Sequence, residues 1–163
     1  LREQLPQRLG IIRVMPNVGA LHQLSVSAIA AEKDTEDSEV AIAKKIFENL
    51  GELVELAEEN FDSFTALCAS GPAFVFEFVS ALQNGAEALG FSKELSERLS
   101  LALVLNTSKT LERSGRSAEQ WVKQVATPGG CTQEGLEVLR KRNFQALMEE
   151  CLKATREKAS KLG

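Results

Sequence analysis

Residues 127–132, Thr-Pro-Gly-Gly-Cys-Thr, are the part of the sequence best suited to chemistry. The adjacent glycines admit backbone angles closed to other residues and let a ligand approach the main chain. A helical pattern begins directly afterwards, and the first N–H groups of a helix have no internal partner. Such a helix start favours a small anion, either a carboxylate or a phosphate. The hydroxyls of Thr127 and Thr132 flank the glycines and can donate or accept hydrogen bonds.

A purely structural interpretation of the same turn is also open. Threonine is a common helix cap. Thr132 would then only cap the helix that follows, and the turn would only connect two helices. The turn by itself does not separate these two interpretations.

The cysteines and the histidine do not form a metal-binding pattern. Cys68, Cys131 and Cys151 are far apart, no Cys-x-x-Cys pair exists, and His22 is the one histidine. Zinc sites need clustered Cys and His ligands. We therefore expect no metal site, and reduced thiols in a cytoplasmic protein.

The composition is that of an ordinary folded domain. Of the 163 residues, 44% are hydrophobic and 26% are charged, and the formal net charge is -4, which argues against disorder. An acidic chain without a basic cluster is poorly suited to nucleic acid. The apolar run 72–82 contains Glu77 and is too short to span a bilayer. We also expect no signal peptide, because residues 1–4 have no apolar stretch behind them. We expect no nucleic-acid partner and no membrane partner.

Residues 1–58 predict an α/β arrangement. Residues 10–15 are a short β-branched run that stops at a Pro-Asn turn. Residues 24–30 alternate apolar residues with small or polar ones, as a half-buried strand does. An amphipathic helix over residues 40–50 leads to a third short strand, residues 53–56.

Residues 59–163 predict helices almost throughout. Ser92 is placed to cap a long helix that ends near Gly115. Ser117 and Gln120 have the spacing of a capping box.

The start of this helical part predicts a break between two helices. Asp62 is placed to cap a short helix that ends near Leu67, and residues 70–72, Ser-Gly-Pro, would open the next one. Residues 73–79 are apolar on almost every side. Another surface must cover such a helix, either in this chain or in a second subunit.

Four segments, in order, resemble the pyrroline-5-carboxylate reductases, the last enzymes of proline synthesis. They are residues 13–17 (Arg-Val-Met-Pro-Asn), 69–74 (Ala-Ser-Gly-Pro-Ala-Phe), 112–115 (Glu-Arg-Ser-Gly) and 125–132 (Val-Ala-Thr-Pro-Gly-Gly-Cys-Thr). The last is the most specific motif, with Thr127 for the usual Ser and Cys131 for the usual Thr or Ala. The order and spacing of the motifs cover essentially the whole chain.

The resemblance implies a mainly α fold. A helical bundle dimerisation domain, like the C-terminal domain of 6-phosphogluconate dehydrogenase, would span residues 59–163. A small α/β remnant of a Rossmann domain would precede it over residues 1–58. Family members carry a Gly-rich phosphate loop, and no Gly-x-Gly-x-x-Gly occurs here. We therefore expect most of the NADP(H) or NAD(H) site to lie outside this chain, and the chain alone to be inactive.

The resemblance also implies site residues. The family reduces 1-pyrroline-5-carboxylate, a cyclic imine, to L-proline with NAD(P)H. Hydroxyl and backbone N–H groups of the turn would bind the substrate carboxylate, from Thr127, Gly129, Gly130 and Cys131. Thr132 would hydrogen-bond the ring nitrogen and help stabilise or protonate it, as the catalytic residue. Three residues would lie near the nicotinamide: Pro16, Asn17 and Ser70. Turn and cap roles remain equally open for Asn17 and Ser70.

The resemblance further implies an interlocked homodimer with the substrate pocket near the subunit interface, and rings of dimers such as a decamer. A second hypothesis is a non-catalytic helical dimerisation module that keeps the turn only as structure. The absence of a Gly-rich phosphate loop favours this module, and the intact turn at residues 127–132 favours the reductase.

Overall fold

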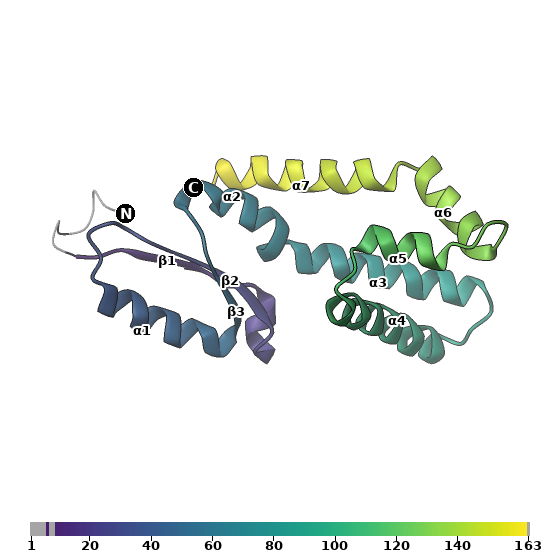
Figure 1. The fold of residues 1–163 in the computed structure, drawn as a ribbon, viewed down its shortest axis with the longest axis horizontal. Coiled ribbons are helices and arrows are strands. Elements are labelled where there is room, and N and C mark those ends of the chain that lie inside the picture. Colours follow the sequence, from purple (N-terminus) through teal and green to yellow (C-terminus); the bar gives the residue numbers. More distant parts are fainter. Residues whose placement is uncertain (1–5, 7–8, 163) are drawn as a thin grey trace. The chain divides into compact units, whose positions relative to one another are not determined.

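The computed structural model describes residue 6 and residues 9–162 and divides into two compact units. The first, the α/β unit, comprises residues 1–73 and 151–163, and the second, the helical unit, comprises residues 74–150. Figure 1 shows the elements along the chain. The sequence-based boundary between residues 58 and 59 stays a prediction.

Three strands and a crossover helix build the α/β unit. They are β1 (Ile12–Met15), β2 (Ser25–Ala31), α1 (Asp37–Phe47) and β3 (Gly51–Glu55). β2 lies between the other two strands, antiparallel to β1 and parallel to β3. The parallel pair requires a crossover, which α1 supplies alongside the sheet (Figure 1). The three predicted strands are confirmed.

Gly51 is required where β3 begins beside β2. Its φ is 137°, a conformation that side chains rarely allow. A Cβ there would lie 2.2 Å from the Ser25 carbonyl oxygen. Only glycine lets the two strands approach this closely.

A core forms on one face of β2. Ala28 is fully buried against Phe61 and Phe64, which are 1% and 7% exposed. Both phenylalanines belong to the short helix α2 (Phe61–Phe64). Met15 and Cys68 pack against the same cluster. The burial of α2 therefore ties the chain after β3 back onto the sheet.

The predicted cap at Asp62 is wrong, whereas the predicted start of the next helix at residues 70–72 is confirmed, since a helix begins at Gly71. Helix α2 begins at Phe61 with Asn60 as its N-cap, so Asp62 lies inside the helix and does not cap it. The backbone then continues through one π-helical turn, Thr65–Ala69, directly into α3 (Gly71–Ala88). Packing of the two buried phenylalanines overrides the local cap signal.

Among the described residues, four helices follow α3, and the first of them ends next to Gly115, as the sequence predicts. They are α4 (Lys93–Ser114), α5 (Ala118–Val125), α6 (Cys131–Lys141) and α7 (Phe144–Ser160). The Ser92 hydroxyl accepts a hydrogen bond from the Leu95 N–H at 3.3 Å. Ser117 and Gln120 form both bonds of a capping box. These caps are confirmed.

The helical unit buries no apolar side chain among its described residues. Only Ser96 and Ser100 are buried there, at 0% and 4% exposure. Large apolar side chains are exposed instead, among them Phe76 at 63% and Leu101 at 59%. An uncovered apolar surface of this extent indicates an interaction site.

The helical stretch Glu58–Ala88 is long and apolar enough to cross a bilayer, judged by length and composition alone. Two residues of its first part, Phe61 and Phe64, are buried in the core of the α/β unit. The run 72–82 is thus part of a longer helical stretch than the sequence indicates.

Phe61→Ala should lower the free energy of unfolding of the α/β unit by about 3–5 kcal/mol, because it leaves a cavity against Ala28. Ile42→Ala is the matched control, since Ile42 is 63% exposed on α1 of the same unit. Urea denaturation followed by circular dichroism, at fixed protein concentration, measures both. Equal losses in the two variants would show that this core does not hold the unit together.

Candidate active site

The turn before α6 is held by its own hydrogen bonds. Gly129 adopts a φ of 72°, and Gly130 is the N-cap of α6. The Gly130 N–H donates to the Thr127 carbonyl oxygen at 3.0 Å. The Gly129 N–H donates to Oε1 of Gln133 at 2.9 Å. The turn is therefore formed before any ligand arrives.

Two backbone donors at the start of α6 remain without a partner in the described part of the chain. They are the N–H groups of Cys131 and Thr132, and no hydrogen bond engages the hydroxyl of Thr132. Both residues are exposed. Free N–H groups at the positive end of an eleven-residue helix suit a carboxylate. Glu134, in the same turn, is exposed to solvent, which weakens its opposing field.

Gly130 cannot be replaced without disturbing the turn. A Cβ there would lie 2.5 Å from Oγ1 of Thr127 and 3.1 Å from the carbonyl oxygen of Thr127. The missing side chain thus lets the Thr127 hydroxyl approach Gly130, the N-cap of α6.

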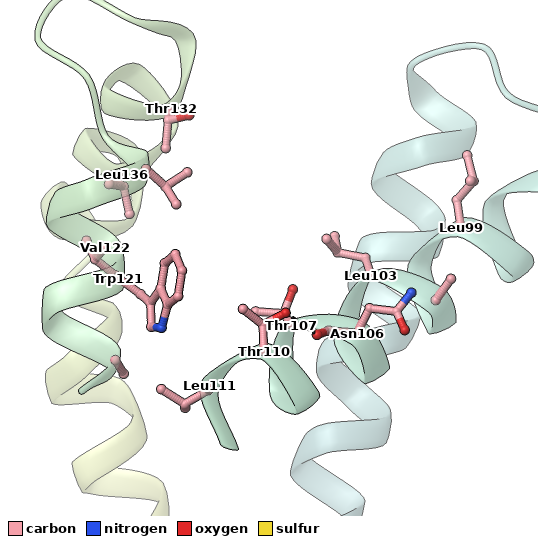
Figure 2. A pocket seen from close by; sticks show the side chains of 13 residues that line it. Leu99, Leu103, Asn106, Thr107, Thr110, Leu111, Trp121, Val122, Thr132 and Leu136 are labelled. Atoms are coloured by element: carbon pink, nitrogen blue, oxygen red, sulfur yellow. Dashed lines mark hydrogen bonds between the residues drawn. The ribbon is translucent and has the colours of Figure 1, made fainter. Parts of the chain in front are cut away.

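A groove of about 730 Å³ opens beside the turn (Figure 2). Helix α4 lines one side of it, and α5 with the start of α6 lines the other. Most of its lining is apolar: Leu99, Ala102, Leu103, Leu111, Ala118, Trp121, Val122, Val125 and Leu136. Its polar lining is Asn106, Thr107, Thr110 and Thr132. Thr132 lies at one end of the groove in Figure 2.

Trp121 forms part of the groove wall and is fixed at two points. Its indole Nε1 donates to the Ser114 hydroxyl at 2.8 Å. The Arg116 guanidinium lies 5.3 Å from the ring centroid, a cation–π contact. Arg116 also donates to Gln124. The α4–α5 connection therefore holds the indole in one orientation.

The three predicted cofactor residues come together in the α/β unit. Nδ2 of Asn17 donates to the Cys68 carbonyl oxygen at 2.9 Å, across 51 residues of sequence. Pro16 is adjacent to Asn17, and Ser70 follows Cys68 by two positions. These residues thus lie close to one another, whereas Thr127 and Gly129–Thr132 belong to the helical unit.

Two features of the site were missed by the sequence prediction. The first is Gln133, whose side chain accepts a hydrogen bond from the Gly129 N–H. Gln at the third position of a helix commonly reaches back over the helix start, so the sequence did contain a signal for this contact. The second missed feature is the carbonyl of Cys68 that Asn17 binds, and no sequence pattern predicts that contact. Burial, and secondarily the Glu52 carboxylate, raises the pKa of the Cys68 thiol, so that thiol is protonated at neutral pH.

Among the described residues, no three His, Cys, Asp or Glu side chains form a group able to hold a metal.

The fold and the turn define a class of protein: a helical dimerisation domain preceded by a small α/β part. The family described as pyrroline-5-carboxylate reductase dimerisation matches residues 58–162. Since this match covers more than half of the chain, the chain belongs to that family.

Individual relatives agree. A pyrroline-5-carboxylate reductase of Aquifex aeolicus is 36% identical over 152 residues, which are 93% of this chain and 57% of that protein. Pyrroline-5-carboxylate reductase 2 of Bacillus subtilis is 28% identical over 96% of this chain and 56% of its own length. The chain therefore spans somewhat more than half the length of the curated relatives it matches.

Solved structures give the same answer. The Plasmodium falciparum pyrroline carboxylate reductase with NADP bound has a TM-score of 0.95 at 27% identity, over 99% of this chain and 64% of that one. The Streptococcus pyogenes 1-pyrroline-5-carboxylate reductase has a TM-score of 0.94 at 26% identity, over 97% of this chain and 61% of that one.

Gly130→Ala should disturb the turn, because the new Cβ would collide with Thr127. We expect shifted NMR amide resonances over residues 127–133 and faster exchange of the amide at position 130. Gly135→Ala is the control: it lies one turn further along α6, where an added Cβ meets no atom within 4 Å. If both variants leave the resonances of the turn unchanged, the turn does not depend on this close approach.

Proposed function

We propose that this chain is the substrate-binding and dimerisation part of a pyrroline-5-carboxylate reductase, which reduces 1-pyrroline-5-carboxylate to L-proline with NAD(P)H. One observation carries the proposal: two unpaired helix N–H groups and a free hydroxyl meet at Thr132, at one end of an apolar groove. The printed names of the relatives support the reaction.

The substrate carboxylate binds at the start of α6. The N–H groups of Cys131 and Thr132 donate to its oxygens, and the Thr127 hydroxyl donates as well. The N–H groups of Gly129 and Gly130 are engaged inside the turn in this structure. These two glycines contribute the space that the carboxylate occupies, and their role as N–H donors to the substrate stays a prediction.

The hydroxyl of Thr132 acts at the ring nitrogen. The imine nitrogen is basic, and hydride addition to the neighbouring carbon turns it into an amine. A hydroxyl that accepts from the protonated nitrogen fixes the ring with one face exposed to the hydride. This arrangement requires neither a nucleophile nor a metal, only orientation and exclusion of water.

The residues of the α/β unit fit the nicotinamide end of the cofactor. An added Cβ at Gly71 would meet no atom within 4 Å, so the space beside this glycine, which follows Ser70, is open. Pro16 is exposed, and Ser70 is half-buried. We place the nicotinamide against these two residues. NAD(P)H, when bound, supplies the hydride. Other parts of the cofactor need a phosphate-binding loop, and no Gly-x-Gly-x-x-Gly occurs in this sequence.

A chimera tests this function. This chain replaces the matching 57% of the Aquifex aeolicus reductase, and NADPH oxidation is followed with 1-pyrroline-5-carboxylate. We expect turnover, and we expect Thr132→Ala to lower kcat by roughly 10²-fold with little change in the KM for NADPH. Thr132→Ser should recover most of the loss because it keeps the hydroxyl.

Thr155→Ala is the matched control for Thr132→Ala, since the Thr155 hydroxyl donates to the Cys151 carbonyl of its own helix at 2.8 Å. It should leave kcat unchanged. A chimera that folds and dimerises without turnover would favour the non-catalytic dimerisation module instead.

We also propose that the chain works as a homodimer through its helical unit. The groove beside Trp121 is apolar, and the exposed face of α3 is apolar too. Every copy carries both surfaces, so a two-fold pair covers both at once. The family description, which includes dimerisation, spans both regions. Assembly into a decamer stays a prediction.

Phe78→Asp on α3 or Leu103→Asp in the groove should dissociate the dimer, because each buries a charge in an apolar contact. Analytical ultracentrifugation measures the result. Ile42→Asp is the control, since it introduces the same charge at an exposed site of the α/β unit. An unshifted dimer in both groove and α3 variants, or binding of the unmodified chain to lipid vesicles, would contradict this proposal.

The cytoplasm is the compartment that we propose for this protein. All three cysteines are free thiols, and Cys131 is exposed. Exposed thiols persist in reducing compartments.

A further inference from the structure

The carbonyl of Cys68 has no main-chain donor in α-helical register. An α-helical carbonyl accepts from the N–H four residues later. That position is Pro72, which has no N–H. The next candidate is the N–H of Ala73, which donates to the Ser70 carbonyl oxygen at 3.0 Å. A half-buried carbonyl that lacks its α-helical donor is stabilised by a donor from another segment.

The backbone around this carbonyl is a single π-helical turn. The Ser70 N–H donates to the Thr65 carbonyl oxygen at 2.9 Å, which closes the turn over five residues. Such turns are rare and frequently occur at functional sites. Here the turn leads directly into Ser70 and the first residue of α3.

Asn17 supplies the missing donor. Its Nδ2 donates to the Cys68 carbonyl oxygen at 2.9 Å, and its Oδ1 accepts from the Gly19 N–H at 2.9 Å. One end of the amide faces a carbonyl and the other faces an N–H. This pattern fixes which end is nitrogen.

The backbone of Asn17 is fixed as well. Its N–H donates to the Ser25 hydroxyl at 3.1 Å, and that hydroxyl bonds the Ser27 hydroxyl at 2.8 Å. Both serines are buried, at 1% and 0% exposure. The side-chain amide is therefore anchored to the central strand of the sheet.

A second contact joins the same two segments. The hydroxyl of Thr65 donates to the Phe61 carbonyl oxygen at 2.8 Å and lies 3.0 Å from the sulfur of Met15. Met15 and Asn17 flank Pro16, so both neighbours of Pro16 are tied to the π turn. Ser70 ends that turn.

We propose that Asn17 is a positioning residue: its amide replaces the N–H that Pro72 lacks, and so it holds the π turn with Ser70 beside Pro16. The link between these segments stands on the hydrogen bonds alone. Its consequence for the reductase, a correctly placed nicotinamide seat, rests on the proposed function.

Amide hydrogen exchange tests the link in the chain itself. Asn17→Asp keeps the acceptor for Gly19 but loses the donor to Cys68. We expect exchange of the amides at Ser70 and Ala73 to accelerate by roughly tenfold. Asn49→Asp is the matched control, because the Asn49 amide donates to the Lys45 carbonyl at 2.6 Å on an exposed helix end. Unchanged exchange at Ser70, or the same acceleration in both variants, overturns the proposal.

A rescue separates this role from a general loss of stability. Asn17→Leu should also accelerate exchange at Ser70. Adding Pro72→Ala restores a main-chain N–H four residues after Cys68 and should recover most of the protection. Asn17→Leu combined with Ile42→Ala, which supplies no donor, should recover none. A failed rescue in a chain that retains its circular dichroism spectrum overturns the proposal.

The chimera extends the test to the reaction. Asn17→Leu should raise the KM for NADPH, and Pro72→Ala should lower it again. If the exchange results hold and the unmodified chimera has no turnover, the link stands and the proposed function fails. If the chimera is active and Asn17→Leu leaves the KM unchanged, the positioning role fails and the proposed function stands.

Discussion

Both sites of this chain are built on backbone groups that lack the main-chain partner that an α-helix interior would give them, either at a helix start or four residues before a proline. At the start of α6, the N–H groups of Cys131 and Thr132 point to no acceptor in the described chain. Before α3, Pro72 leaves the Cys68 carbonyl without its α-helical donor. The two cases differ in where the missing partner comes from. The side chain of Asn17, just after β1, donates to the carbonyl within the protein, whereas the two N–H groups stay open for a ligand.

The two units also differ in how many side chains they bury. The α/β unit has its own core around Phe61 and Ala28. The helical unit buries only two serines among its described residues, and one of them, Ser96, has no partner for its hydroxyl. An isolated helical bundle buries apolar stripes between its helices. A unit that leaves these stripes exposed reaches a stable state only with another surface, which is the physical content of a dimerisation domain.

Local signals explain how much of this was predictable from sequence. The caps at Ser92 and Ser117 depend on contacts three residues away, so a short sequence pattern predicts them. The anion-binding turn is local for the same reason. The π turn is different, because it depends on the burial of Phe61 and on an amide 51 residues away from Cys68. No pattern within a short window contains either interaction, and the local cap signal at Asp62 therefore gave a wrong helix start.

The position of Thr132 connects assembly with chemistry. Its side chain lines one end of the groove whose walls include Trp121 and Leu103. The Thr132 hydroxyl can act strongly on a charged substrate ring only if water has left this end of the groove. Hydrogen bonds to a charged group become stronger as the local dielectric constant falls. The groove is open in the single chain, so in the dimer proposed above a helix that fills the groove would also exclude water from the site. A substrate that binds only to the dry site of the dimer would therefore stabilise the dimer. By linkage, this stabilisation equals the free energy by which dimerisation strengthens substrate binding.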